Sequence, residues 1–476
     1  MNWGAIPALL LLACAGCASA PAPLPLALTY RIDAQPGALE VEVEVSGPCP
    51  AEWRLGQPIA GELSATTPEG EVRRRLDRRR RVHFPPGARR VRYRYALAER
   101  TRTYQSLQAG AGGARSYMLS GSSYLLRPTG LAADTQVRLE LRGLEPLLPW
   151  ALREREGGGH EVELAARDLL APGHHGFGLR RHSLETPGGS LEVGFVEGDL
   201  DVSDEVVLSW LRQAQREVVH CRPSGRAPHP RIQVILIPAS GSWEPAPFGR
   251  VLWSYPQSVA LYVGEHASAP ELLDDWTAIH ELCHTLHPRV VPRRAWLTEG
   301  LATYYQCVAR IRSGRESAAR MWGAMAWGYE AGSGEANGLN LRDLDRRLRE
   351  LHCYRAVYWG GAFLMLELDL ELRRRSEGRV TLDHVVARVL PKGRITSKDF
   401  AAAVDALAES PLWAEVGRPH LEEALMSRAP ELLARLGVEG VGRRATLAAG
   451  AADEALRRAI EGDQAVSPQA EPGAPR

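Results

Sequence analysis

The sequence has almost no net charge and almost no lysine. Its 476 residues carry 58 basic and 57 acidic side chains, a formal net charge of +1. Nothing in this balance indicates a nucleic acid or an acidic partner. Lysine occurs only at Lys392 and Lys398, which indicates a GC-rich genome and carries little functional content. A hydrophobic share of 45% and a charged share of 24% are ordinary for a globular protein of two or three domains.

One local basic run, between Arg73 and Arg81, stands out against this balance. It is compatible with contact to anionic lipid or polysaccharide, but a solvated strand edge is the favoured interpretation.

The amino terminus has the pattern of an export signal. Residues 5–13 are almost wholly apolar, too few to cross a bilayer, and Ala15-Gly16-Cys17 follows, although no basic residue precedes them. This pattern is typical of a bacterial lipoprotein signal, in which the cysteine after the cleavage site is lipidated. Cys17 is the expected membrane anchor, and Cys14 is the alternative. We therefore expect an exported lipoprotein of the bacterial cell envelope, periplasmic or at the cell surface, with a signal over 1–17 and a linker over 18–26.

Cysteine is also scarce after the signal. The five that remain are Cys49, Cys221, Cys283, Cys307 and Cys353. Export permits disulfides, but an odd count leaves at least one cysteine unpaired or bonded to another chain. The pairing cannot be assigned from the sequence.

The first part of the chain shows the alternation of β-strands. Apolar and polar residues alternate over residues 39–45, 91–95, 137–142 and 162–164. Such alternation buries one face of a sheet and leaves the other in water, with antiparallel pairing. We predict an N-terminal antiparallel β-sandwich-like domain over residues 27–188, with no evident catalytic set of its own.

The remainder is predicted to be α/β and then helical, which makes the whole chain α+β. Residues 201–205 combine a hydroxyl cap with acids, which predicts a helix that runs to about Cys221. Residues 232–237 predict a buried strand, and residues 258–263 predict the edge strand that lines the cleft. The expected boundaries are 189–314 for a catalytic domain, 315–462 for a C-terminal helical domain that forms the second wall of the cleft, and 463–476 for a disordered tail.

Residues 280–284 read His-Glu-Leu-Cys-His. On a helix, positions i and i+4 share a face, so His280 and His284 can present two imidazoles to one metal ion. Glu281 lies beside them, placed to take a proton from water. Glu299 can supply a third ligand from a following helix and leave one position open, which is the arrangement of a hydrolytic zinc site.

The surrounding residues place this motif on a helix. Leu272, Trp276, Ile279, Cys283 and Leu286 recur at steps of four and three, which is typical of the apolar seam of an amphipathic helix. Cys283 falls on this seam and is expected to be a buried small hydrophobe rather than a ligand. The alternative is that both histidines lie at the surface and that Glu299 is a solvated carboxylate.

These residues resemble the gluzincin metallopeptidases of the thermolysin clan. The similarity is nearest to the glycyl aminopeptidase family and more distant to the aminopeptidase N family, and it runs from about residue 27 to 462. In those families a Trp-Leu-x-Glu-Gly segment supplies the glutamate ligand, and here Trp296–Gly300 reads Trp-Leu-Thr-Glu-Gly. A Tyr-x-Lys-Gly segment supplies the tyrosine that stabilises the oxyanion, and here it reads Tyr358-Trp359-Gly360-Gly361.

The resemblance implies a thermolysin-like catalytic domain with one zinc ion per chain. His280, His284 and Glu299 would be its ligands, Glu281 the general base and Tyr358 the oxyanion donor. Tyr354 is the backup for Tyr358.

Three departures from the family pattern bear on the substrate. Gly360 stands where the families have lysine. The stretch Val251–Gln257, which corresponds to the segment whose glutamate holds a substrate's free amine, contains no acid. The chain also has no room for the carboxy-terminal PDZ domain of the glycyl aminopeptidase family. Aminopeptidase and endopeptidase activity therefore both stay open.

The predicted function is zinc-dependent hydrolysis of peptide bonds in a peptide or protein substrate. Thr303, one turn after Glu299, is expected to orient a ligand, and Tyr304 and Tyr305 are expected to be packing residues. Two alternatives remain. One is an exported peptide-binding or structural lipoprotein with a weakly active metal site, and the other is a zinc hydrolase of a non-peptide substrate.

Overall fold

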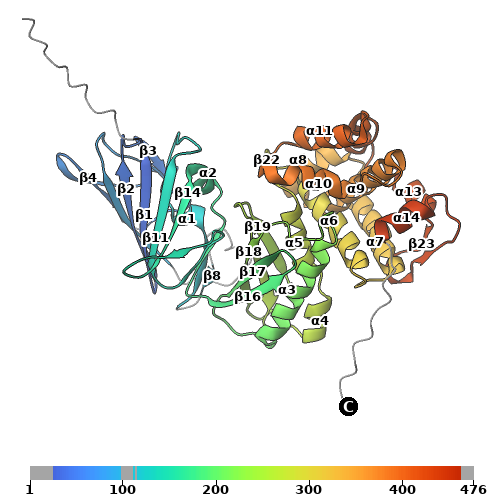
Figure 1. The fold of residues 1–476 in the computed structure, drawn as a ribbon, viewed down its shortest axis with the longest axis horizontal. Coiled ribbons are helices and arrows are strands. Elements are labelled where there is room, and N and C mark those ends of the chain that lie inside the picture. Colours follow the sequence, from blue (N-terminus) through green and yellow to red (C-terminus); the bar gives the residue numbers. More distant parts are fainter. Residues whose placement is uncertain (1–24, 60, 98–110, 113–114, 463–476) are drawn as a thin grey trace, which may run out of the picture.

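The computed structural model describes residues 25–59, 61–97, 111–112 and 115–462. The expected signal with Cys14 and Cys17, the linker up to residue 24 and the tail over 463–476 lie outside the described residues, so these expectations stay predictions. Within the described ranges, no helix has the length and apolar character needed to cross a membrane. A β-rich part, an α/β part and a helical part follow one another along the molecule (Figure 1).

An eight-stranded sheet dominates the first part. Its order is β13 (Arg153–Glu154), β14 (His160–Ala165), β11 (Gln136–Gly143), β1 (Ala27–Gln35), β2 (Ala38–Ser46), β7 (Arg90–Ala96), β4 (Leu63–Thr67) and β5 (Gly70–Arg74). The four segments with alternating residues are strands of this sheet, as predicted. The sheet is not purely antiparallel, because β1 pairs in parallel with β11. Alternation along a strand reports burial of one face and not the direction of the neighbouring strand, so the sequence could not reveal this pair.

Two small sheets and two short helices cover one face of the large sheet. One sheet has the order β10 (Arg127–Pro128), β3 (Glu52–Arg54), β6 (Arg81–His83); the other has the order β12 (Pro146–Leu147), β15 (His174–Phe177), β9 (Tyr117–Ser120), β8 (Ala111–Gly112). The helices are α1 (Gly121–Tyr124) and α2 (Ala166–Leu170). Their apolar side chains share a core with those of the large sheet, whose alternate residues are buried. The β-sandwich-like arrangement expected from the sequence is therefore present.

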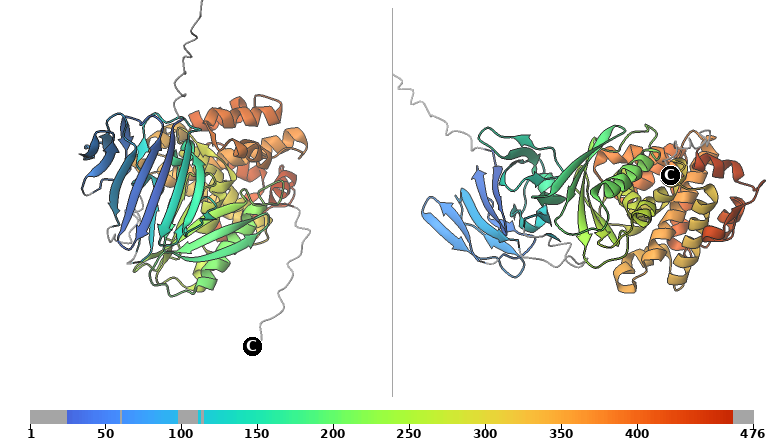
Figure 2. Two further views of the ribbon diagram at one scale, coloured as in Figure 1. Left: turned by 60° about the vertical axis from the view of Figure 1, so that its left-hand side comes forward. Right: turned by 90° about the horizontal axis from the view of Figure 1, so that it is seen from below.

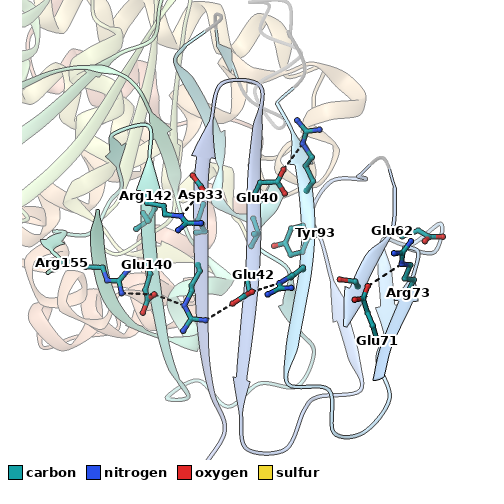
Figure 3. A pocket seen from close by; sticks show the side chains of 17 residues that line it. Asp33, Glu40, Glu42, Glu62, Glu71, Arg73, Tyr93, Glu140, Arg142 and Arg155 are labelled. Atoms are coloured by element: carbon teal, nitrogen blue, oxygen red, sulfur yellow. Dashed lines mark hydrogen bonds and ion pairs between the residues drawn. The ribbon is translucent and has the colours of Figure 1, made fainter. Parts of the chain in front are cut away.

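The other face of the large sheet carries a ladder of ion pairs in water (Figure 3). Arg31 lies between Glu42 at 2.9 Å and Glu140 at 3.2 Å, and Arg92 also reaches Glu42 at 2.7 Å. These acids and bases neutralise one another across the strands, so this face presents no surplus of one charge. The basic run begins on the edge strand β5, where Arg73 is exposed, which agrees with a solvated strand edge.

A five-stranded sheet forms the centre of the second part. Its order is β16 (Arg180–Thr186), β17 (Gly189–Phe195), β18 (Arg231–Ala239), β20 (Ser258–Gly264), β19 (Phe248–Leu252). The chain enters this sheet at β16, before the boundary expected between residues 188 and 189. The prediction that residues 258–263 form the edge was wrong, because β19 pairs antiparallel with β20 and lies outside it. β20 is buried along its whole length, as a strand between two neighbours must be.

Helices pack on one face of this sheet. Helix α3 (Asp204–Val219) begins where predicted, with the Ser203 side chain accepting a hydrogen bond from the Val206 amide. Helices α4 (Ala269–Asp274) and α5 (Thr277–Cys283) follow, and α5 continues into a 3₁₀ turn over His284–Leu286. The opposite face packs against the first part through a small core that joins Met118 and Leu147 to Ile235 and Tyr262.

The third part is helical, as predicted. It comprises α6 (Ala295–Arg312), α7 (Ala318–Glu335), α8 (Leu341–Leu351), α9 (Tyr354–Ser376), α10 (Leu382–Val389), α11 (Ser397–Ala408), α12 (Arg418–Glu422), α13 (Ala429–Arg435) and α14 (Glu454–Glu461), with the short pairs β21 (Arg289–Val290) and β22 (Arg394–Ile395), and β23 (Val438–Glu439) and β24 (Thr446–Leu447). The apolar side chains of these helices belong to one core with those of the second part, and Figure 2 shows the two parts side by side. Helices α6 and α9 approach most closely at Gly300 and Gly361, where a Cβ on Gly361 would collide with the backbone of α6. This contact fixes the position of Tyr358 relative to Glu299.

Candidate active site

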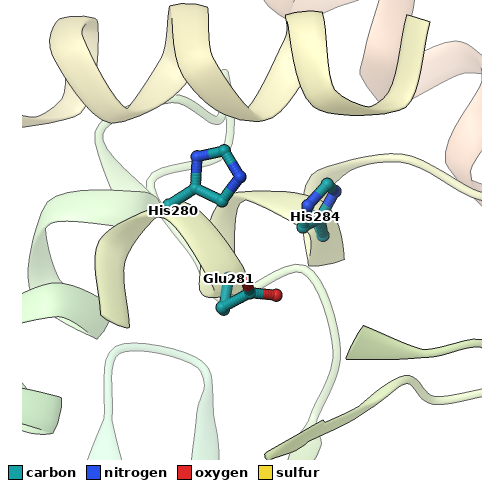
Figure 4. Close-up of side chains that lie close together, drawn as sticks. All are labelled: His280, Glu281 and His284. Carbon is teal, nitrogen blue, oxygen red and sulfur yellow. The ribbon is translucent and has the colours of Figure 1, made fainter. Parts of the chain in front are cut away.

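The two motif histidines lie on either side of a change in helix type. His280 belongs to α5, and His284 is the first residue of the 3₁₀ turn. Both side chains keep the shared face that the i, i+4 spacing predicts (Figure 4). The predicted apolar seam is only partly correct. Ile279, Cys283 and Leu286 are buried as predicted.

The N-terminal half of the seam is different. Leu272 belongs to the separate helix α4. Trp276 is the N-cap residue of α5 and is 49% exposed, with its ring 5.5 Å from that of His280. A continuous helix was predicted because periodicity alone does not show a helix break of two residues.

Three atoms that can bind a metal ion converge between α5 and α6. The Nε2 atoms of His280 and His284 lie 3.5 and 3.2 Å from Oε2 of Glu299. All three residues are at least nine-tenths buried. The predicted carboxylate therefore reaches both imidazoles from the second helix.

Hydrogen bonds on the far sides of the rings determine which nitrogens are free. Nδ1 of His280 donates to Oε1 of Gln306 at 2.7 Å. Nδ1 of His287 donates to the carbonyl of Pro288 at 2.9 Å, so Nε2 of His287 is an acceptor and receives the Nδ1 proton of His284 at 3.4 Å. Both motif histidines are thus held in the tautomer that turns an unprotonated Nε2 toward Glu299.

Neither Gln306 nor His287 was predicted from the sequence. Thr303 was expected to orient a ligand, but within the described part of the chain the Thr303 hydroxyl has no hydrogen-bond partner. Gln306 lies one turn further along α6 and takes that position. The signal for Gln306 was its spacing of two turns from Glu299, and the signal for His287 was its i+3 spacing from His284. Burial lowers the pKa of His287 to about 3, so this ring is neutral.

The donor set fits a zinc ion. In the neutral tautomers, two imidazole nitrogens and a carboxylate oxygen point lone pairs at one another, an arrangement that a metal ion or a proton between them stabilises. Ligands bound at about 2.0–2.1 Å to a tetrahedral ion stand about 3.3–3.4 Å apart, close to the observed 3.2 and 3.5 Å. Two histidines and one glutamate are also the protein ligands of one class of catalytic zinc site.

The charges at the site support binding of a cation. A proton on Nε2 of His280 can take the place of that cation, because it forms a hydrogen bond to Glu299. Burial lowers the pKa of His280, but this hydrogen bond and the charges of Glu281 and Glu299 outweigh burial and raise the pKa above its ordinary value. Burial raises the pKa of Glu299, but the charge of His284 and the hydrogen bonds from both histidines hold it well below its ordinary value. The second oxygen of Glu299 accepts a hydrogen bond from Arg293 at 3.0 Å, which leaves Oε2 for the histidines.

Glu281 lies at the mouth of this cluster. Its carboxylate is within 4.8 Å of the ring nitrogens of both motif histidines (Figure 4). Burial raises the pKa of Glu281 above its ordinary value. The edge strand β19 packs directly on this side chain, because a Cβ added to Gly249 would overlap it. Glu299 approaches both Nε2 atoms more closely than Glu281 does, although Glu281 also lies within reach of an ion between the two histidines.

Tyr358 lies opposite, on the second turn of α9. Its ring stacks on that of His280, with centroids 6.1 Å apart and an angle of 8° between the planes. Burial and the neighbouring charge of Glu299 raise the pKa of the Tyr358 phenol, so its hydroxyl keeps the proton. Tyr354 is 43% exposed and lies beside Tyr358 with ring centroids 6.4 Å apart. A Cβ on Gly360 would lie 2.6 Å from the end of the Leu425 side chain, so a longer side chain here would require Leu425 to move.

The remaining expectations concern residues next to the site. The hydroxyls of Tyr304 and Tyr305 donate to the buried Asp369 and Asp383, so these tyrosines join α6 to α9 and α10 as packing residues. Cys283 is fully buried, as predicted. Among the described residues, the cysteines Cys49, Cys221, Cys283, Cys307 and Cys353 are all free thiols.

Comparisons with known proteins locate this site within a known fold. No family model matches the sequence, and no curated protein matches it. Solved structures do match. An aminopeptidase N family protein from Idiomarina loihiensis superposes with a TM-score of 0.64 at 14% identity, over 86% of this chain and 78% of that protein. An M1 zinc metallopeptidase from Deinococcus radiodurans superposes with a TM-score of 0.50 at 15% identity, over 88% of this chain and 96% of that protein. At these identities the likeness concerns the fold, and the chain has the fold of the M1 zinc metallopeptidases and the aminopeptidase N family.

Proposed function

We propose that this protein is a zinc-dependent metallopeptidase that hydrolyses peptide bonds. The observation that carries this proposal is the convergence of His280 Nε2, His284 Nε2 and Glu299 Oε2, with Glu281 beside them. Their occurrence in a fold shared with zinc metallopeptidases supports it. A closer relation to the glycyl aminopeptidase family stays a prediction.

His280, His284 and Glu299 would hold the zinc ion. When bound, zinc would supply a Lewis acid that lets water give up a proton near neutral pH. The Glu281 carboxylate would accept that proton and later deliver it to the leaving amine. The Tyr358 hydroxyl, which stays protonated, would donate a hydrogen bond to the oxyanion that develops from the scissile carbonyl.

The test separates metal binding from proton transfer. Glu281→Gln keeps the size of the side chain and removes the base, so zinc should remain bound at one ion per chain while peptide cleavage falls by about 10² to 10⁴-fold. Tyr358→Phe should lower kcat by about 10² to 10³-fold with zinc still bound. Glu217→Gln is a matched control, because Glu217 is equally buried but lies on α3 and hydrogen-bonds Gln213. Full activity of Glu281→Gln would contradict the assignment of the base.

Digestion of a proteome-derived peptide library would decide between exopeptidase and endopeptidase activity. Cuts next to free amino termini would indicate an aminopeptidase, and internal cuts would indicate an endopeptidase. If the zinc-loaded wild type cuts no peptide, the proposal fails and a binding or structural role, or hydrolysis of a non-peptide substrate, takes its place.

A further inference from the structure

An apolar cavity of about 540 Å³ opens directly beside the candidate active site. His280 and Tyr358 belong to its wall as well as to the site. The rest of the wall comes from the N-cap of α5 and from one face each of α6, α7 and α9. The cavity therefore begins where the scissile bond of a substrate would lie.

Large aromatic side chains dominate the wall. Trp276, Trp327 and Tyr354 line it and are 49%, 45% and 43% exposed, and they are among the most exposed large apolar side chains of the described residues. Trp359 completes the aromatic wall, with its ring 6.1 Å from that of Trp327. Its indole lies against Gly328, where a Cβ would overlap the ring. Apolar side chains gathered around one concave site favour binding of an apolar group.

The three arginines of the wall are paired with acids, one of which, Glu316, belongs to the wall, whereas Glu335 lies outside it. Arg310 and Arg320 each lie 3.0 Å from Glu316, and Arg355 lies 2.6 Å from Glu335. These arginines already have acidic partners, so a charged substrate group would have to displace an existing ion pair. The cavity thus favours a neutral occupant.

Two buried polar atoms in the wall, the Thr303 hydroxyl and Nε of Arg310, have no hydrogen-bond partner among the described residues. Thr303 lines the cavity and is 3% exposed, and its hydroxyl makes no hydrogen bond to any described residue. A buried hydroxyl without a partner costs about 1–3 kcal/mol, which an occupant with a polar atom would recover. Tyrosine and tryptophan side chains combine an apolar body with one polar atom.

We infer that this cavity binds a large aromatic side chain of the substrate, on a residue that flanks the scissile bond. The inference rests on the proposed peptidase function and adds its substrate class. Stacking on Trp327 and Trp359 supplies the apolar contact, and the Thr303 hydroxyl pairs with the polar atom of a tyrosine or tryptophan.

The first experiment measures binding without catalysis. Calorimetry on the metal-free full chain would compare N-acetyl-tryptophan amide with N-acetyl-alanine amide. The aromatic amide should bind at least about tenfold more tightly. Ala324→Phe places a ring in the cavity from α7 and should abolish that difference. Trp243→Ala should leave it unchanged, because Trp243 is 75% exposed and stacks on His266, outside the cavity wall.

The second experiment measures cleavage by the zinc-loaded full chain. Peptides cut by the wild type should be enriched in aromatic residues on one side of the cut. Two peptides that differ only by tryptophan or alanine at that position would then be compared. Ala324→Phe should reduce the ratio of kcat/KM for the tryptophan peptide to kcat/KM for the alanine peptide by about tenfold or more. Trp327→Ala should also reduce this ratio, and this variant replaces Ala324→Phe in the test if Ala324→Phe does not fold.

The outcomes separate the two proposals. Equal binding of both amides by the wild type, or a ratio that Ala324→Phe leaves unchanged, would overturn the aromatic pocket. Tight aromatic binding without any peptide cleavage would support the pocket and overturn the peptidase.

Discussion

The hydrogen bond between Gln306 and His280 offers a sharp test of the metal centre. His280 is 4% exposed, and Gln306→Leu removes the acceptor for its Nδ1 proton. In the Gln306→Leu variant with zinc bound, the His280 ring must keep Nε2 toward the ion, so its Nδ1 proton stays buried and unpaired. In the metal-free variant the ring is free to turn. An unpaired buried donor costs about 1–3 kcal/mol, and lost support of a ligand usually costs about 10 to 100-fold in metal affinity. We therefore expect zinc affinity to fall by about 10 to 100-fold.

Competition between the full chain and a chelating dye at fixed pH would measure this affinity. Thr303→Val is the matched control, because Thr303 lies one turn earlier on α6, is more buried than Gln306 and makes no hydrogen bond to any described residue. It should leave zinc affinity unchanged. Gln306→Glu keeps an acceptor and should bind zinc at least as well as the wild type. The reasoning is refuted if Gln306→Leu binds zinc within about twofold of wild type, or if Thr303→Val weakens binding as much.

Two further predictions concern stability. His175 is buried, its ring accepts a hydrogen bond from Tyr124 and donates one to the Pro172 carbonyl, and burial lowers its pKa from 6.5 to about 4. The unfolded chain takes up this proton near pH 6.5 and the folded chain near pH 4, so the free energy of unfolding should fall as pH falls through this window, by up to about 3 kcal/mol. Urea denaturation at several pH values should show a smaller fall in His175→Gln, and an equal fall would exclude His175 as the cause. Gly361→Ala should destabilise the fold by about 1–3 kcal/mol, because its Cβ would strike the facing helix. Gly334→Ala on α7 is the control, because a Cβ at Gly334 meets open space, and it should be at least as stable as wild type in thermal unfolding. Equal melting temperatures for both variants and wild type would contradict the close contact of α6 and α9.

Local patterns predicted most of the secondary structure. The alternating segments are strands, residues 315–440 are mostly helical, and the cap at Ser203 begins α3. These predictions succeeded because they depend on a period of two or 3.6 residues, or on one hydrogen bond between near neighbours.

Predictions that depend on which elements pack beside a strand or helix were less successful. Residues 258–263 are as apolar as an inner strand, yet only the pairing with β19 shows that they are not at the edge. The parallel pairing of β1 with β11 joins segments about a hundred residues apart in the chain. Trp276 was assigned to an apolar seam, although the chain bends before it and leaves its indole exposed.

By itself, the sequence determined which side chains can form the candidate site. The spacing of His280, Glu281 and His284 places two imidazoles on one face, and the family resemblance of the Trp296–Gly300 segment predicts Glu299 as the third metal ligand. The tertiary structure alone decided how this set is supported and what lies beside it. Gln306 and His287 orient the rings, Gly249 brings the edge strand onto Glu281, and three helices enclose an aromatic cavity. The physical reason is the separation along the chain of the residues involved. Ligand spacing within one helix is a local property, whereas the tautomer of a ring and the shape of a cavity depend on contacts between segments far apart in the chain.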